Sequence, residues 1–77
     1  MRTFDDTQGQ HWQAALMEAS FGGVVLVFGR IGGSEVLQKA LDAEAANLDA
    51  AEQLLANLDE AGLRAFLAEA VPCRNGG

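Results

Sequence analysis

The sequence predicts an α+β fold, in which an antiparallel β-meander of three or four strands is followed by two carboxyl-terminal helices packed on one face of the sheet. Two observations lead to this prediction. The first half of the chain consists of alternating or β-branched apolar segments separated by glycine-containing turns. The last third repeats apolar residues at helical spacing in two successive segments.

The first two predicted strands lie on either side of a short polar turn. Residues 4–6 precede this turn, in which Gly9 can take the positive φ angle that a tight hairpin needs, and Asp6 is expected to accept hydrogen bonds from it. Residues 10–19 then alternate, as is typical of an antiparallel strand with one solvated face. One face would carry Trp12, Ala14 and Leu16, and the other His11, Gln13, Ala15 and Met17.

The middle of the chain predicts a central strand and then an ambiguous segment. The run Val24–Phe28 is apolar throughout, which favours a strand inside the sheet, and residues 29–34 follow as a glycine-rich turn. Residues 35–46 can be read as strand or helix. Alternation is poor there, and Val36, Leu37, Ala40 and Leu41 would share one face of a helix. The short connection favours a fourth strand, and a helix beginning at Ser34 is the alternative.

Two amphipathic helices are predicted in the last third of the chain. Asp59 fits the N-cap of the second helix, with Leu58 and Leu63 placed for a hydrophobic staple across it. This helix is expected to end before Pro72. Because neither helix is long enough to be stable alone in water, both should bury their apolar faces on the sheet. These faces consist of Leu48, Ala51, Leu54, Leu55 and Leu58 in the first helix and Leu63, Phe66, Leu67 and Ala70 in the second.

Length and charge indicate one small acidic domain. The 77 residues leave room for a single core, and we expect a domain over residues 1–71 and a flexible tail over residues 72–77. The chain has 11 acidic and 5 basic residues, with a net charge of −6. Residues 42–70 hold seven of the acids and Arg64 as the one base. Such a surface repels phosphate backbones, so direct nucleic-acid binding is not expected.

The sequence also predicts a cytoplasmic protein without membrane contact. Asp5 and Asp6 stand near the amino terminus, where a signal peptide needs a basic start and an apolar stretch. The longest strongly apolar run, Val24–Phe28, is too short to cross a bilayer. Cys73 is the only cysteine, which excludes an intrachain disulfide and fits a reducing compartment.

No catalytic, metal or cofactor site is predicted. His11 is the only histidine and lies at the opposite end of the chain from Cys73, so ligands for a structural zinc are lacking. A strand over residues 11–20 would hold His11 about 30 Å from Ser20, too far for a catalytic triad. The segment Val24–Gly33 resembles the dinucleotide-binding loop of glyceraldehyde-3-phosphate dehydrogenases, but Val27 stands where that fingerprint needs a glycine. We therefore predict a non-enzymatic protein without a cofactor; whether the terminal Gly76 and Gly77 have a role is left open.

Two surfaces remain as candidate binding sites. If alternate residues of the central strand face the helices, the opposite sheet face is also apolar, and such a face is rarely left in water unless it binds something. Its predicted anchors are Ala15, Met17, Val25 and Val27. The leading hypothesis is a protein-binding or adaptor module that forms a homodimer through this face, unless residues 35–46 or the tail cover it. The alternative is an acidic inhibitor or nucleic-acid mimic that docks on a basic partner through Asp49, Glu52, Asp59, Glu60 and Glu69.

Overall fold

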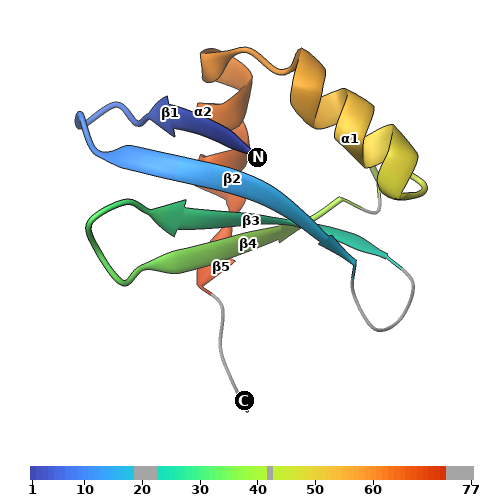
Figure 1. Cartoon of the computed structure of the whole chain (residues 1–77), viewed down its shortest axis with the longest axis horizontal. Coiled ribbons are helices and arrows are strands. Elements are labelled where there is room, and N and C mark those ends of the chain that lie inside the picture. The colour runs from blue at the N-terminus through green and yellow to red at the C-terminus, as the bar shows by residue number, and fades with distance from the viewer. Residues whose placement is uncertain (19–22, 42, 73–77) are drawn as a thin grey trace.

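The computed structural model describes residues 1–18, 23–41 and 43–72 and confirms the predicted α+β arrangement (Figure 1). It contains five antiparallel strands rather than three or four, and their order in the sheet follows the chain, β1-β2-β3-β4-β5. The elements are β1 (Arg2–Asp5), β2 (His11–Glu18), β3 (Val24–Arg30), β4 (Val36–Ala40), α1 (Leu48–Asn57), α2 (Glu60–Glu69) and β5 (Val71–Pro72).

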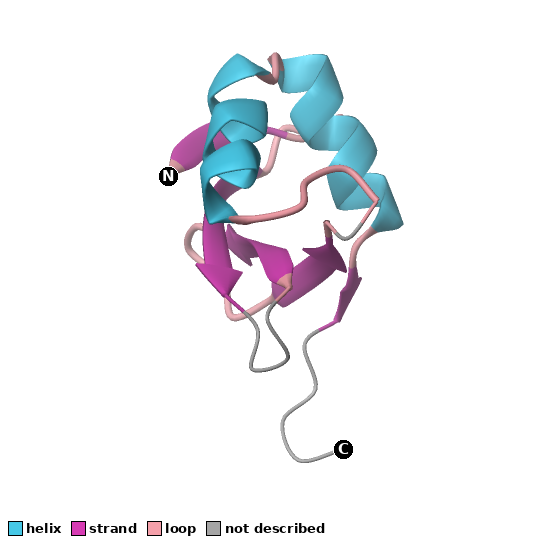
Figure 2. Cartoon of the chain, turned by 90° about the vertical axis from the view of Figure 1, so that its right-hand side faces the viewer, coloured by secondary structure: helices cyan, strands magenta, loops and turns pink. Residues whose placement is uncertain are grey.

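Both helices lie on the same side of the sheet (Figure 2). The core forms between them and the inner face of the strands, where Phe28 is fully buried and meets Phe4 edge to face, with ring centroids 5.9 Å apart. The sheet also contributes Trp12, Ala14, Val24 and Leu26 to this core, and the helices contribute Ala51, Leu55 and Leu63. In the part of the chain that is described, neither helix has the length and apolar character needed to cross a bilayer.

The ambiguous segment after residue 34 forms a strand. Within β4, Leu37 pairs with Phe28 and Lys39 pairs with Leu26, so both side chains share the inner face with core residues. Lys39 occupies a position where the alternation leads one to expect an apolar residue, which is why the pattern was ambiguous in the sequence. Leu41, just after the strand, is buried in the core.

A fifth strand, which the sequence does not predict, follows the second helix. Helix α2 ends at Glu69, before Pro72 as expected, and the next two residues pair with β4. Val71 pairs with Gln38 and Pro72 with Leu37. A proline lacks a backbone N–H and is tolerated in a strand at the edge of a sheet. Pro72 therefore belongs to the sheet, and residues 73–77 lie outside the described residues.

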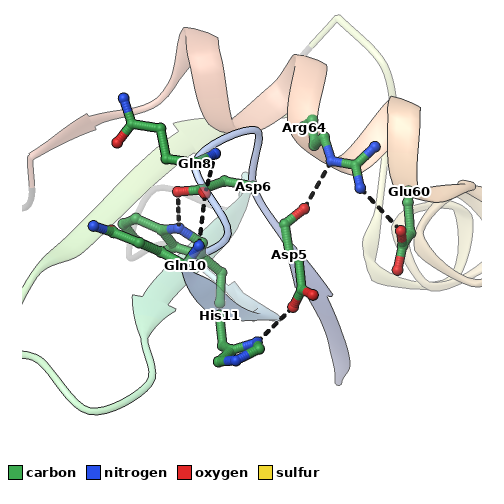
Figure 3. Close-up of polar contacts among 8 residues, drawn as sticks. Asp5, Asp6, Gln8, Gln10, His11, Glu60 and Arg64 are labelled. Atoms are coloured by element: carbon green, nitrogen blue, oxygen red, sulfur yellow. Dashed lines mark hydrogen bonds and ion pairs between the residues drawn. The ribbon is translucent and has the colours of Figure 1, made fainter.

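The β1–β2 turn is organised by one carboxylate. One oxygen of Asp6, Oδ1, accepts hydrogen bonds from the backbone N–H groups of Gln8 at 2.8 Å and Gln10 at 2.9 Å (Figure 3). Gly9 takes the positive φ expected of it, +83°. The prediction that Asp6 accepts hydrogen bonds from the turn is confirmed, since a short acidic side chain competes well for backbone donors at such a position.

Both helices begin at side-chain caps. Asn47 accepts a hydrogen bond from the Ala50 N–H at 2.9 Å, and Asp59 accepts one from the Gly62 N–H at 2.8 Å. The second of these caps was predicted from the sequence. Each satisfies a backbone donor that has no partner within the first helical turn.

Candidate functional site

The side of the sheet opposite the helices is called the outer face. Cross-strand partners point to the same side of a sheet and successive residues to opposite sides, so the strand registers define its members. The chain carries a net charge of −6, but the one acid among these members is Asp5, which lies at the β1 edge of the face beside His11. The members are Thr3 and Asp5 in β1, His11, Gln13, Ala15 and Met17 in β2, Val25, Val27 and Gly29 in β3, Val36, Gln38 and Ala40 in β4, and Val71 in β5.

The four predicted anchors lie together at the centre of this outer face. Ala15 pairs directly with Val27, and Met17 pairs directly with Val25. On the other side of β3, Gln38 pairs with Val27. The alternation in β2 and the apolar run of β3 were sufficient to place these residues, because the period of a strand is set by local geometry.

Exposure differs strongly among the residues of the outer face. Met17 is 52% exposed, Val36 43% and Val71 57%, whereas Val25 is only 8% exposed and Val27 is half-buried. The side chains available to a partner are therefore on β2, β4 and β5, around a central strand that its neighbours already enclose in part.

Residues 35–46, considered above as a cover for this face, do not cover it in the described ranges. β4 lies within the sheet beside β3, and Ala45 packs in the core on the helix side. Across residues 1–18, 23–41 and 43–72, both helices pack on the inner face and every strand belongs to the sheet. The tail, the other cover considered above, lies outside the described residues from position 73 onward.

Sequence reasoning missed several residues of the outer face. Val36 was assigned to an ambiguous segment, and Val71 lies in a strand too short to show a period. Gly29 was assigned to the following turn, but it lies inside β3, paired with Gln13 on one side and Val36 on the other. The signal that could have found Gly29 is the continuing alternation of Val25, Val27 and Gly29.

The five acidic residues predicted as a docking surface lie on the two helices or at the N-cap of α2, and not on the outer face. Three of them make contacts within the chain: Asp59 caps α2, Glu60 pairs with Arg64 at 3.0 Å, and Glu69 pairs with Lys39 at 3.2 Å. Asp49 and Glu52 are exposed on α1. All five acids are exposed, but Asp59, Glu60 and Glu69 also hold contacts within the chain.

Lys39 is the most enclosed charge among the contacts described. Its ammonium group lies 3.2 Å from Glu69 and 3.5 Å from Glu44, and 5.5 Å from the centre of the Phe66 ring. Its side chain is only 14% exposed. The hydrogen bond to Glu69 is the main cause of the raised pKa of Lys39; burial opposes it, and the charge of Glu44 adds to the rise. This cluster fastens α2 to β4.

A second polar cluster lies at the β1 end of the sheet (Figure 3). His11 Nδ1 lies 2.6 Å from the Asp5 carboxylate, and Arg64 Nε donates to the Asp5 carbonyl oxygen at 2.7 Å. Ser20, considered above as a partner of His11 in a catalytic triad, and Cys73 lie outside the described residues. The described ranges hold no group of three or more His, Cys, Asp or Glu side chains placed to bind a metal ion. This arrangement ties β1 to β2 and to α2.

Comparison with known proteins adds no identification. No family model, no curated protein and no solved structure matches the chain. A function must therefore be inferred from the surfaces of the chain itself.

Proposed function

We propose that this chain is a small non-enzymatic protein-binding module that self-associates through its outer face. The supporting observation is that the two helices cover only one face of the sheet. In the described residues both helices pack on the inner face, while the outer face keeps Met17, Val36 and Val71 exposed around a valine-rich centre. Contiguous apolar surface of this kind marks contact sites in water-exposed proteins.

The size of the chain is compatible with such an interface. A standard interface buries about 800 Å² on each partner, which is roughly one sixth of the 4879 Å² that the chain exposes. Two copies joined through their outer faces would form a sandwich of two sheets, with the helices on the outside. Sheets stacked in this way pack about 10 Å apart and bury the inward side chains of both layers.

The proposal is tested by sedimentation equilibrium on the wild-type chain and on two matched variants. Met17→Lys places a charge on the outer face, and Gln53→Lys makes the same change in charge on the exposed side of α1. Met17→Lys should weaken self-association by about a hundredfold or more, because a buried unpaired charge is costly, and Gln53→Lys should leave it nearly unchanged. Val25 is a poor choice for this test, because it is buried within the sheet and its replacement would disturb the fold.

A wild-type chain that remains monomeric at millimolar concentration would refute self-association. Equal weakening by Met17→Lys and Gln53→Lys would also count against the outer face, because the effect would then not depend on which face carries the substitution.

The second candidate is docking of a basic partner on the acidic helices. The observation that favours it is the exposed pair Asp49 and Glu52 on α1. Binding of this kind weakens steeply with salt, since the contacts are exposed charges. A double variant, Asp49→Asn with Glu52→Gln, should then abolish binding to a polycation such as polylysine, while Met17→Lys should not affect it.

A further inference from the structure

Nothing in the described part of the chain requires a glycine at position 29. It lies in the central strand β3, within the ladder that joins Gln13 to Val36, and its φ angle is not in the left-handed region. A Cβ atom built on it would meet only Gln13 Cγ, at 3.9 Å, among the described atoms within 4 Å. This is an ordinary van der Waals contact, so an alanine would fit.

Two other glycines of the described residues have a conformational reason within the chain. Gly9 and Gly32 take positive φ angles of +83° and +86°. A Cβ atom on Gly33 would meet the end of the flexible Arg30 side chain, and one on Gly62 would lie 2.7 Å from Leu58 Cδ2, so a neighbouring side chain would have to shift at either position. Gly29 has neither a positive φ angle nor a close neighbour at its Cβ position. A glycine inside a strand weakens the strand, because it loses more conformational freedom on folding and packs no side chain.

The direction in which Gly29 faces suggests what the missing side chain allows. Its Cβ position points to the outer face, alongside Val27 and between Gln13 and Val36. A glycine in a strand often marks a place where a ligand or another chain approaches closely. Gly29 therefore leaves a position without a side chain on the outer face, between Gln13 and Val36.

Met17 is the matching projection on the same face. It is 52% exposed, and methionine is flexible enough to fill an irregular space. Met17 pairs with Val25, and Gly29 lies four residues further along β3, which is about 13 Å at the rise of an extended chain. The midpoint between Met17 and Gly29 falls at the Ala15–Val27 pair, in the middle of the predicted anchors.

We infer that Met17 of one copy occupies the space above Gly29 of a second copy, and that the second copy makes the same contact in return. Both contacts form at once if a two-fold axis lies between the two copies, parallel to their outer faces and above the Ala15–Val27 pair. This is the reciprocal geometry that a two-fold interface requires, in which residue i meets j and j meets i. The inference rests on the proposed self-association and names the contact that sets its register.

Charge favours a second copy as the occupant. The chain has a net charge of −6, and of the acids among the described residues only Asp5, at the β1 edge, belongs to the outer face, so two like-charged copies can meet there with nearly all these acids directed away from the contact. A basic partner would find a single carboxylate, that of Asp5, on this face and would bind the acidic helices instead. Added salt screens the repulsion between copies and should therefore strengthen their association.

The test compares Gly29→Ala and Met17→Ala with the wild-type chain, using sedimentation equilibrium for association and thermal unfolding at high dilution for the fold. Each variant should weaken the dimer by roughly tenfold or more, Gly29→Ala by filling the space and Met17→Ala by leaving it empty. Gly29→Ala should at the same time unfold at an equal or higher temperature, because the strand gains a better residue.

A cross-linking experiment tests the reciprocal geometry directly. In a Cys73→Ser background, Met17→Cys and Gly29→Cys chains are prepared separately and oxidised alone or mixed. Disulfide-linked dimers should form mainly in the mixture, because the contact joins Met17 of one copy to Gly29 of the other.

The outcomes separate the two claims. A monomeric wild-type chain would remove both the proposed self-association and this contact. A wild-type dimer that Gly29→Ala leaves intact, or cross-linking that is as strong in Met17→Cys alone as in the mixture, would overturn the Met17–Gly29 contact and leave self-association standing.

Discussion

The carboxylate of Asp6 accepts a hydrogen bond from the indole Nε1 of Trp12 at 2.9 Å and so joins the β1–β2 turn to a buried aromatic ring of the core. The other oxygen of the same carboxylate binds two backbone N–H groups of the turn. One side chain therefore sets both the hairpin and the position of Trp12. The hydrogen bond from Trp12 is the main cause of the lowered pKa of Asp6, and the backbone bonds from Gln10 and Gln8 act in the same direction.

Replacement of this carboxylate should destabilise the fold. Asp6→Ala removes the acceptor for Trp12 Nε1 and for two backbone donors, so we expect a clearly lower midpoint of thermal unfolding. The matched control is Asp5→Ala, one residue earlier, whose carboxylate makes one exposed contact with His11. If the control lowers the midpoint as much as Asp6→Ala does, the proposed importance of the turn carboxylate is wrong.

The same carboxylate predicts a loss of stability in acid. Because the pKa of Asp6 is lower in the folded chain than the ordinary value of 3.8, the folded state binds this proton less readily than the unfolded state. The contribution of Asp6 to stability is thus present above that value and is lost as the pH falls through the lower pKa of the folded state. Urea unfolding at a series of pH values should show a weaker acid dependence in Asp6→Asn than in the wild type; identical curves would contradict this assignment.

Lys39 predicts a loss of stability at alkaline pH. Its pKa is raised, chiefly by the hydrogen bond to Glu69, so its contribution is complete below the ordinary value of 10.5 and is lost as the pH rises through the higher pKa of the folded state. Lys39→Met keeps the apolar stem beside Phe66 but removes the charge. We expect its stability to fall less between pH 9 and 12 than that of the wild type, measured by urea unfolding. A variant with the wild-type alkaline profile would exclude Lys39 as the group responsible.

Arg2 links the first strand to the first helix. Its Nη1 atom donates to the carbonyl oxygens of Leu55 at 2.8 Å and Leu58 at 3.0 Å, at the carboxyl end of α1, where backbone acceptors lack helical partners. Arg2→Ala should lower the free energy of unfolding by about 1–2 kcal/mol and speed amide hydrogen exchange in the last turn of α1. Arg2→Lys keeps the charge without the planar guanidinium, so its free energy of unfolding should lie between those of the wild type and Arg2→Ala. Unchanged exchange in α1 would show that the contact is not maintained in solution.

Local patterns in the sequence were sufficient for most of the fold. The alternation of β2, the apolar run of β3 and the Asp59 cap depend on residues within one strand or one helical turn of each other, so they can be read without tertiary structure. The predicted interface residues Ala15, Met17, Val25 and Val27 came from the same periodicity, which is why the structure brings them together.

Only the tertiary structure decided the features that join distant parts of the chain. The sequence alone determined both helices, the first three strands and the residues that share a face in them, because those properties arise between near neighbours, but it left β4 ambiguous and did not predict β5. The pairing of β5 with β4, the bonds from Arg2 to α1 and the enclosure of Lys39 by Glu44 and Glu69 depend on how the helices pack across the sheet. The place of Gly29 within β3, opposite Gln13 and Val36, likewise depends on the register of three strands. Such contacts follow from the simultaneous burial of many apolar side chains, and no local pattern encodes them.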